Sequence, residues 1–188
     1  TISASLAVIE EEADRLSKMI DDLLDASRLQ AGGLSINRAD VSLAAVAARV
    51  AERFSSQTKK HTIVTDFPEK FPIILADETR LEQVISNLVS NAIKYAPKGE
   101  IKISGGLRPD QVIVCVSDEG PGIDARDLPH IFDRFYRSTT AVKHTKGAGL
   151  GLYLARAIVE AHGGRIWADA SNGAKSETGA RICFSLPR

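Results

Sequence analysis

The sequence has few cysteines, few aromatic residues and no excess of either charge. Its two cysteines, Cys115 and Cys183, do not form a CxxC pair, so chemistry that depends on paired cysteines in one motif is excluded. Both lie in alternating apolar stretches. We therefore expect reduced structural thiols in a reducing compartment, and with them a cytoplasmic location.

The charges balance, since 24 basic and 24 acidic residues give a formal net charge of +0. This balance argues against a nucleic-acid partner and against contact with a membrane surface, so a charged ligand must be met by local groups. No apolar run approaches the ~20 residues that a membrane-spanning helix needs, and no signal peptide is visible. The chain begins at Thr1 rather than at methionine, which is compatible with a piece of a longer protein.

What is present is enough apolar sequence for one sizeable core and an appended element, because 44% of the 188 residues are hydrophobic. The first region, residues 1–33, carries a heptad pattern that predicts a long coiled-coil-like helix over 2–29. Such a stripe cannot be buried by the helix itself and requires partner helices. The residues that form it are Leu6, Ile9, Ala13, Leu16, Ile20, Leu23 and Ser27.

The second region, residues 34–188, changes repeatedly between helical and strand periodicity. Ser42 is a candidate N-cap and Pro97 a helix stop. Because strands and helices do not alternate strictly, we predict an α/β domain in which a mixed β-sheet carries helices on one face, rather than a doubly wound parallel sheet. The expected helices are 41–54, 78–96 and 147–162, and the expected strands are 61–67, 72–77, 100–106, 111–118, 164–170 and 180–186.

Two asparagines one turn apart, Asn87 and Asn91, stand out in the predicted helix 78–96. With Arg80 and Lys94 they form a stripe along the border of its apolar face. A solvated helix flank would explain one asparagine, but two serve neither packing nor helix propensity. Their side chains offer carbonyl oxygens to a hard cation and amide hydrogens to phosphate oxygens.

The stretch "VIVCVSDEGPGI" ends a predicted strand at a carboxylate. Alternation places Asp118 on the same face as the apolar valines, so it is expected to point inward. It could simply open a turn. In the functional interpretation, Gly120 and Gly122 let the backbone approach a flat ligand, and Asp118 accepts a hydrogen bond from an exocyclic amine.

A third motif, "KGAGLGL", places Gly147, Gly149 and Gly151 before and at the start of a helix. Free amides and the helix dipole at such a start favour phosphate, although the glycines could instead mark a hinge. The spacing matches neither GxGxxG after a strand nor a P-loop, so a different nucleotide-binding fold is indicated.

In this order and at these separations, "NLVSNAIKY", "DEGPGI", "FDRFYR", "GAGLGL" and "TGARICFSLP" resemble the N, G1, F, G2 and G3 boxes of sensor histidine kinases of two-component systems. The stretch "EADRLSKMIDDLLDASRLQAGGL" is similar to the second helix of their dimerisation and histidine-phosphotransfer domain. The resemblance implies that 1–33 is that helix, and that 34–188 is an ATP-binding catalytic domain with the two-layer sandwich of the histidine kinase and gyrase type.

The resemblance also implies roles for individual residues. Asn91 would coordinate the Mg²⁺ bound to ATP, with Asn87 near the same metal and the phosphates. Asp118 would receive the adenine amino group, and Arg137 would face the γ-phosphate, so Asn87 and Arg137 are the expected catalytic residues. A lid is expected over 138–146. The cofactor-binding set is Asn87, Asn91, Lys94, Tyr95, Asp118, Gly120, Gly122, Lys146, Gly147, Gly149, Leu150 and Gly151.

The function implied is transfer of the γ-phosphoryl group of Mg·ATP to a histidine, for relay to a response regulator. In the family that histidine lies in a box upstream of the helix that begins here, and none of the four histidines, His61, His130, His144 and His162, has that context. His162 is explained by a helix C-cap, and the others by surface or lid positions. The full-length protein is expected to dimerise through the N-terminal helix and is a candidate inner-membrane sensor.

Two other functions are compatible with a nucleotide-binding domain of this kind. One is a regulatory module that holds ATP without transferring it, and the presence of both asparagines, Lys94 and Arg137 argues against it. The other is an ATP hydrolase of the same superfamily, in which a glutamate that activates water stands where this sequence has Asn87. The heptad pattern and the aromatic-basic segment "IFDRFYR" also favour a kinase.

Overall fold

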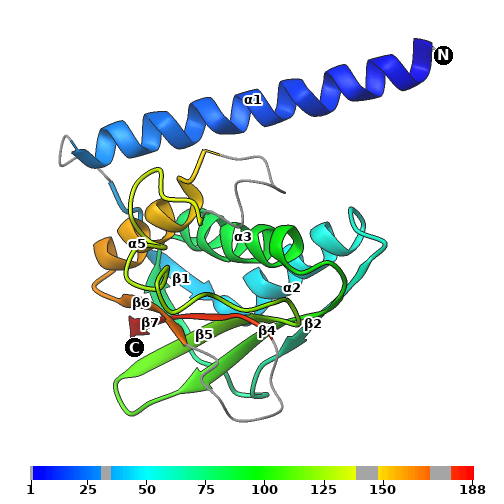
Figure 1. Ribbon diagram of the computed structural model, residues 1–188. Helices are drawn as coiled ribbons and strands as arrows, with labels where there is room; N and C mark the ends of the chain where they lie inside the picture. Colours follow the sequence, from blue (N-terminus) through cyan, green and yellow to red (C-terminus); the bar gives the residue numbers. More distant parts are fainter. Residues whose placement is uncertain (1, 31–34, 139–147, 170–178) are drawn as a thin grey trace. The chain divides into compact units, whose positions relative to one another are not determined.

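A computed structural model describes residues 2–30, 35–138, 148–169 and 179–188 (Figure 1). The chain divides into two compact units, Thr1–Leu34 and Ser35–Arg188. Each unit is considered separately below.

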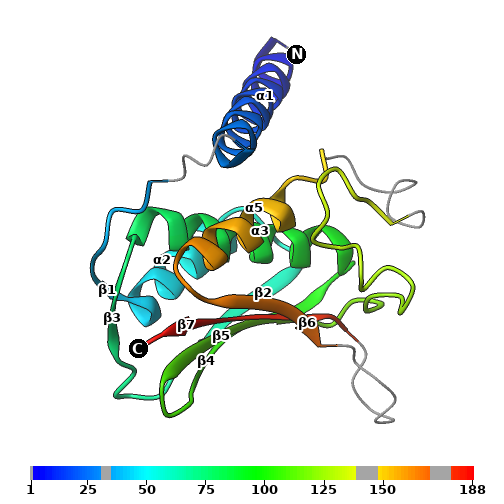
Figure 2. The same ribbon diagram turned by 90° about the vertical axis from the view of Figure 1, so that its left-hand side faces the viewer.

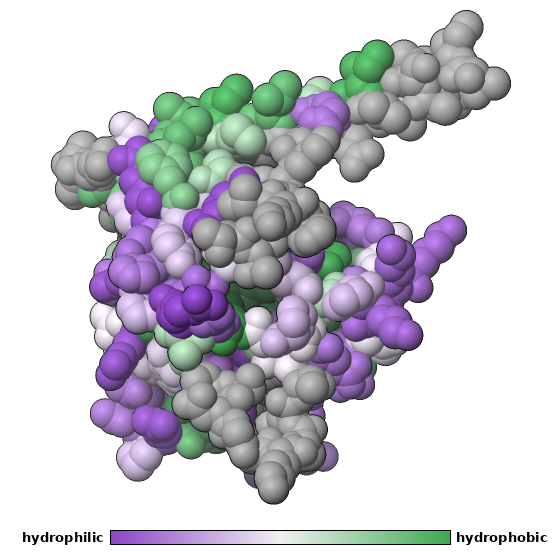
Figure 3. All heavy atoms as spheres, viewed as in Figure 1, coloured by the Kyte–Doolittle hydropathy of each residue, from purple (hydrophilic) through white to green (hydrophobic). Residues whose placement is uncertain are grey.

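The first unit contains the helix α1 (Ile2–Gln30), as the heptad pattern predicts. Figure 3 shows hydrophobic residues gathered along it. Ile9, Leu16 and Ile20 are 57–65% exposed, and Leu23 and Leu24 are 40% and 51% exposed. A row of exposed apolar side chains on one helix is the pattern expected of a surface that pairs with other helices. Nowhere in the described residues is a helix both long and apolar enough to cross a membrane.

The second unit is built on a five-stranded sheet with the strand order β2-β4-β5-β7-β6. β2 runs parallel to β4, and the other neighbours are antiparallel, so the predicted mixed sheet is confirmed. The strands are β2 (His61–Asp66), β4 (Gly99–Leu107), β5 (Gln111–Asp118), β6 (Arg165–Asp169) and β7 (Arg181–Pro187).

Three helices, α2 (Leu43–Ser55), α3 (Glu78–Tyr95) and α5 (Gly151–Ala161), cover one face of this sheet (Figure 2). Val112 and Val114 of β5 and Leu81 and Leu88 of α3 are at most 1% exposed, so the core lies between the two layers. The predicted two-layer arrangement is therefore confirmed.

The helix starts follow from local capping. The Ser42 hydroxyl accepts a hydrogen bond from the Ala45 N–H at 3.3 Å, which confirms Ser42 as the N-cap of α2. Asp77 caps α3 by accepting from the Arg80 N–H at 3.0 Å. Pro97 follows the end of α3, as predicted.

A separate two-stranded ribbon pairs β1 (Ala39–Ser42) with β3 (Ile73–Ala76) in antiparallel fashion. The strand at 72–77 is predicted correctly, but its partner β1 is missed. Only Val41 of β1 is buried, so the four residues show no alternation that could reveal a strand.

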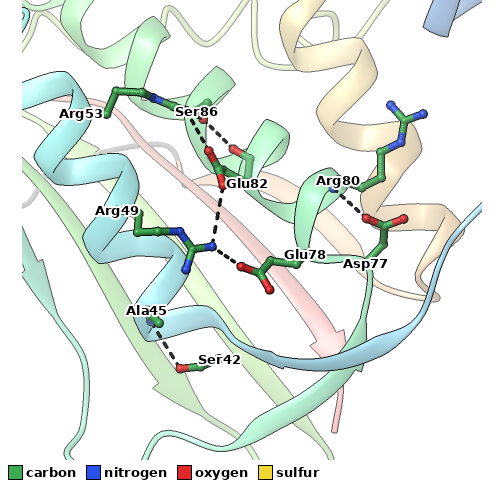
Figure 4. A network of polar contacts seen from close by, with 9 residues as sticks. All are labelled: Ser42, Ala45, Arg49, Arg53, Asp77, Glu78, Arg80, Glu82 and Ser86. Atoms are coloured by element: carbon green, nitrogen blue, oxygen red, sulfur yellow. Dashed lines mark hydrogen bonds and ion pairs between the residues drawn. The ribbon is translucent and has the colours of Figure 1, made fainter.

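Ion pairs hold α2 against α3 (Figure 4). Arg49 pairs with Glu78 and Glu82, and Arg53 Nη1 lies 2.8 Å from Glu82 Oε1. Arg53 Nη2 also donates to the Ser86 hydroxyl at 2.6 Å. These contacts link α2 to one side of α3, the helix that carries both asparagines.

The two cysteines require a correction. Cys115 of β5 and Cys183 of β7 are joined by a disulfide, so the expectation of reduced thiols is wrong. They are 68 positions apart in sequence but directly opposite each other in the β5–β7 ladder. Only the pairing of the strands brings them together, and no local sequence pattern reports that pairing.

Candidate functional site

A cavity of about 550 Å³ opens beside the C-terminal half of α3, the end of β5 and the segment 121–138. Most of its wall is apolar, and the polar groups that line it come from several elements. The apolar lining includes Leu88, Ala92, Val116, Ile123, Ile131, Leu152 and Ile182, and the polar lining includes Asn91, Lys94, Tyr95, Asp118, Asp124, Asp127, Tyr136, Arg137 and Ser138. An apolar cavity with a few polar groups is the usual form of a small-molecule site.

Asp118 lies at the end of β5 and lines this cavity, as the strand alternation predicts. Its Oδ1 accepts hydrogen bonds from the Gly120 N–H at 2.8 Å and the Ala180 N–H at 3.2 Å. Burial raises the pKa of Asp118, and the two backbone donors and His61 oppose that shift only in part. Both interpretations of Asp118 therefore hold, because its side chain lines the cavity and its Oδ1 accepts hydrogen bonds within the turn. Within the described residues Oδ2 has no hydrogen-bond partner and can serve a ligand.

Two glycines keep the backbone close to this carboxylate. A Cβ at Gly120 would lie 2.8 Å from Asp118 Oδ1 and 3.1 Å from the Ala96 Cα. At Gly179, where φ is +135°, a Cβ would lie 1.8 Å from the Asp118 backbone oxygen. Any side chain at either position would push Asp118 out of place. Gly120 therefore contributes by allowing Asp118 its position, whereas Gly122 lines the cavity itself.

The two asparagines of α3 have different environments. Asn91 lines the cavity together with Lys94 and Tyr95, whereas Asn87 is 5% exposed and is absent from the lining. Asn87 Nδ2 donates to the Gly151 carbonyl oxygen at 3.1 Å and so ties α3 to the start of α5. The prediction that both amides lie at the rim of the core is therefore correct for Asn91 and wrong for Asn87.

The segment 121–138 contributes polar side chains to the cavity wall that were not predicted from the sequence. The Tyr136 hydroxyl donates to Asp127 Oδ1 at 2.7 Å, and this hydrogen bond raises the pKa of Tyr136. Hydrogen bonds from Arg126 lower the pKa of Asp124 to about 2. The signal for Tyr136 was the aromatic-basic segment, but nothing there assigned it to the cavity wall. Arg137, which was predicted, does line the cavity.

The glycine-rich motif is only partly within the described residues. Gly149 has φ +72°, and its carbonyl oxygen accepts from the Phe135 N–H at 3.0 Å. Leu150 is buried and Gly151 opens α5, but neither they nor Gly149 line the cavity. Lys146, Gly147 and all of the predicted lid except Ser138 lie outside the described residues.

The histidines that the structure describes have structural contacts. His162 is 3% exposed, donates from Nδ1 to the Ile158 carbonyl oxygen at 2.8 Å and accepts at Nε2 from the Asp77 N–H at 3.0 Å. It is the C-cap residue of α5, as predicted. His130 is exposed beside Asp133, as expected of a surface residue. His61 is half-buried rather than a surface residue and contacts the Ala96 carbonyl oxygen at 3.1 Å, and His144 lies outside the described residues.

No group of three histidine, cysteine or acidic side chains that could hold a metal ion is found in the described parts of the chain. Hard cations such as Mg²⁺ prefer oxygen ligands, and an amide carbonyl oxygen is one of them. Asn91, which lines the cavity, offers such an amide oxygen.

Comparison with known proteins agrees with this geometry. Residues 76–188 match the family described as histidine kinase-, DNA gyrase B- and HSP90-like ATPase. The sensor histidine kinase WalK of Bacillus subtilis is 33% identical over 187 residues, which cover 97% of this chain and 30% of WalK. The chain thus spans less than a third of that relative's length.

Solved structures are also similar. Full-length ShkA in complex with AMPPNP gives a TM-score of 0.82 at 29% identity, covering 98% of this chain and 38% of that one. The histidine kinase ThkA in complex with the response regulator protein TrrA gives a TM-score of 0.75 at 27% identity, covering all of this chain and 51% of that one.

Proposed function

The chain belongs to the family of histidine kinase-, DNA gyrase B- and HSP90-like ATPases, and we propose that its second region, 34–188, is the Mg·ATP-binding catalytic domain of a sensor histidine kinase. The observation that carries this proposal is the position of Asp118, a carboxylate at an otherwise largely apolar part of the cavity.

The base end of the proposed site is lined by apolar side chains beside the Asp118 carboxylate. Val116 and Ile182 form adjacent parts of the sheet wall, and Leu88 and Ala92 of α3 also line the cavity. An adenine ring fits such walls because both of its faces are apolar, and its amino group would donate to Asp118 Oδ2. The second oxygen, Oδ1, is already engaged by the backbone, which fixes the orientation of the carboxylate.

The phosphate end uses the polar side chains of α3 and of the segment that follows Tyr136. Asn91 offers an amide oxygen to the metal, while Lys94 and Arg137 carry positive charge toward phosphate. Asn87 is proposed to serve the same end, with Arg137 facing the transferred group. Mg²⁺ bound with the nucleotide supplies charge neutralisation at the phosphates, and catalysis then depends on positioning and electrostatic stabilisation. Tyr95 is proposed to lie against the adenine.

The glycine-rich motif is proposed to line the triphosphate. Gly147, Gly149, Leu150 and Gly151 would present backbone amides near the start of α5, and Lys146 would add a charge. Gly120 and Gly122 would let the backbone approach the base. These assignments extend the geometry described above and follow the resemblance.

The first region, 1–33, is proposed to be the second helix of the dimerisation and phosphotransfer domain. Its exposed apolar row on α1 would pair with helices of its own and a second subunit in the full-length protein. The γ-phosphoryl group would pass to a histidine on a helix outside this sequence and then to a response regulator, the kind of partner that ThkA is seen with. We propose a cytoplasmic location for this part of the protein.

Calorimetric titration with Mg·ATP tests the proposal, and incubation with γ-labelled ATP tests the missing acceptor. The protein should bind Mg·ATP yet acquire no label, whereas a longer stretch of the protein that includes the preceding helix should become labelled. Acid-labile, base-stable label on one of the four histidines would contradict the assignment of the acceptor. Absence of binding to Mg·ATP would contradict the function itself.

A further inference from the structure

The disulfide joins two residues that the sheet holds opposite each other in any case. The Cα atoms of Cys115 and Cys183 are 4.1 Å apart, near the roughly 4.5 Å of a non-hydrogen-bonded pair in an antiparallel ladder. Seven consecutive residue pairs, from Gln111 opposite Pro187 to Ser117 opposite Arg181, fix this register. The two sulfurs therefore stay adjacent whether or not they are bonded, so the bond can open and close in the folded protein.

The bridge lies directly behind the cavity. The next residue pair along the ladder, Val116 and Ile182, lines the cavity from the opposite face of the sheet. Asp118 ends β5, and Ala180 immediately precedes β7. The Asp118 N–H donates to the Ala180 carbonyl oxygen at 3.0 Å, and the Ala180 N–H donates to Asp118 Oδ1 at 3.2 Å. The disulfide thus ties together the two strands whose ends orient the proposed base-recognising carboxylate.

The two sulfurs have neighbours of opposite charge. Arg181 Nη2 lies 3.5 Å from Cys115 Sγ, and Asp169 Oδ2 lies 3.8 Å from Cys183 Sγ. When the bridge is open, the guanidinium stabilises a thiolate on Cys115, whereas the carboxylate disfavours one on Cys183. Cys115 is therefore the better nucleophile of the pair.

Two side chains that contact the sulfurs, those of Arg181 and Asp169, are themselves partly exposed. Cys115 and Cys183 are 3% and 1% exposed. Successive residues of a strand face opposite sides of the sheet, so Cys115 and its partner Cys183 point away from the side of the buried Val114 and Val116. The helices α2, α3 and α5 lie on that other side (Figure 2). The Arg181 and Asp169 side chains beside them are 53% and 46% exposed. A small reagent can reach the sulfurs by displacing exposed side chains, without opening the core.

We propose that Cys115 and Cys183 form a reversible thiol–disulfide site that tunes nucleotide affinity, an inference that rests on the proposed function for its nucleotide and its cytoplasmic setting. In reducing compartments, disulfides are usually transient or redox-sensing, which favours a reversible bridge over a permanent one.

The oxidant is a low-molecular-weight disulfide. The Cys115 thiolate attacks one of its sulfurs and releases one thiolate, and the Cys183 thiolate then displaces the second to close the bridge. Two electrons pass to the reagent, which leaves as two thiols with the protons of the two cysteines. An excess of low-molecular-weight thiol reverses the reaction.

The state of the bridge can be read at Trp167, which is the chain's one tryptophan and lies opposite Cys183 in the β6–β7 register. A disulfide quenches a neighbouring excited indole by accepting an electron. After treatment with oxidised glutathione the denatured protein should show no free thiol. Subsequent dithiothreitol on the folded protein should give two thiols and brighter Trp167 fluorescence. A Cys115→Ser/Cys183→Ser variant should show no fluorescence response.

Coupling to the cavity is measured by calorimetry with Mg²⁺ and a non-hydrolysable ATP analogue on the oxidised and reduced forms. The oxidised form should bind about three- to tenfold more tightly, because the bridge preorganises the strands that hold Asp118. The double serine variant should bind equally with and without reductant. Since both forms of the natural protein are compared, the test does not depend on the variant folding well.

Three results would overturn the inference. Two free thiols after treatment with oxidised glutathione would mean that no bridge forms, and a bridge that opens only on denaturation would be a permanent staple. Equal nucleotide affinity in both forms would remove the coupling. If neither form binds nucleotide, the proposed function falls and the coupling with it, while the thiol and fluorescence measurements still decide whether the redox site exists.

Discussion

The two ends of the cavity are built in different ways. At the base end, Asp118 Oδ1 accepts hydrogen bonds from two backbone donors, and Gly120 and Gly179 let the backbone pass close to it. At the phosphate end, Asn91 and Lys94 project from α3, and Arg137 comes from the segment that precedes residues outside the described ranges. Backbone geometry thus defines one end, and longer side chains define the other.

This difference has a consequence for specificity. A carboxylate whose position is fixed by the backbone can distinguish one base from another, because it cannot turn away from an unsuitable group. Side chains such as those of Lys94 and Arg137 can follow phosphate oxygens as they move, which suits charge neutralisation. Base selection and phosphate binding should therefore be separable by mutation.

The largest effect is expected at the phosphate end. Asn91→Ala removes an amide oxygen from the proposed metal site, so affinity for Mg·ATP should fall by roughly 10- to 100-fold. The preference for ATP over GTP should be retained, because Asp118 is untouched. Calorimetric titrations with both nucleotides, with Mg²⁺ and with EDTA, measure both quantities. A loss of base preference in this variant would show that the two ends are not independent.

Asn87, one turn earlier on α3, provides a matched comparison. Asn87→Ala removes the side-chain hydrogen bond to the Gly151 carbonyl oxygen and the packing of a side chain that is 5% exposed, so the free energy of unfolding should fall by about 1–3 kcal/mol. Asn91→Ala should cost less than about 1 kcal/mol, since Asn91 faces the cavity. Urea unfolding of both variants decides between them. Equal stability losses would mean that the α3–α5 contact is not what Asn87 supports.

Nucleotide binding by Asn87→Ala is a separate question. If Asn87 also serves the metal, as proposed, its variant should lose Mg·ATP affinity in addition to stability, measured under conditions where the protein remains folded. Unchanged affinity would assign Asn87 to the α3–α5 contact alone.

The raised pKa of Asp118 predicts a pH effect at the base end. Because its pKa is raised, the Asp118 carboxylate gains a proton at a higher pH than an ordinary aspartate does. As the pH is lowered and Asp118 loses its charge, ATP affinity should fall by up to about tenfold. Asp118→Asn cannot titrate, so the difference between its profile and that of the natural protein isolates this group from the titration of ATP itself. Parallel profiles would remove Asp118 from base recognition.

The same pKa shift has a defined sign in stability. The folded state holds the Asp118 proton more tightly than the unfolded state, so this contribution to the free energy of unfolding falls as pH rises through the window between the ordinary and the raised pKa. Above that window Asp118→Asn should be at least as stable as the natural protein, because it has no buried charge. Thermal unfolding across pH provides the measurement.

The smallest effect is expected where α2 meets α3. Arg53→Ala removes an ion pair with Glu82 and a hydrogen bond to Ser86, but the Arg53 side chain is 45% exposed. The free energy of unfolding should fall by no more than about 1 kcal/mol, with nucleotide affinity unchanged. A change in ATP affinity would indicate that the position of α3 depends on these surface contacts.

Much of the fold could be predicted because its signals are local. The heptad pattern predicted α1, and Ser42 predicted the start of α2. The alternation of the valines in β5 predicted which face of that strand is buried. Asp118 could be assigned an inward direction from that alternation alone. The order of motifs then indicated the family more strongly than any one motif.

What was missed depends on contacts between distant segments. The disulfide between Cys115 and Cys183 follows from strand register, and the depth of Asn87 follows from the packing of α5 against α3. Neither is visible in the periodicity of a single element. Tyr136 and Asp127 meet in the cavity wall only because an irregular segment folds back on itself, which no periodic pattern describes.

The most direct test of the account is the base preference of the natural protein and of Asp118→Ala. Guanine presents a carbonyl where adenine presents its amino group, so in bound GTP this carbonyl oxygen and the Asp118 carboxylate would be two acceptors facing each other. GTP should therefore bind at least roughly tenfold more weakly than ATP. Calorimetry with both nucleotides should show that Asp118→Ala weakens ATP binding and narrows this margin together. If Asp118→Ala keeps the natural affinity and selectivity, Asp118 is only a turn residue, and the proposed pocket for the base is wrong.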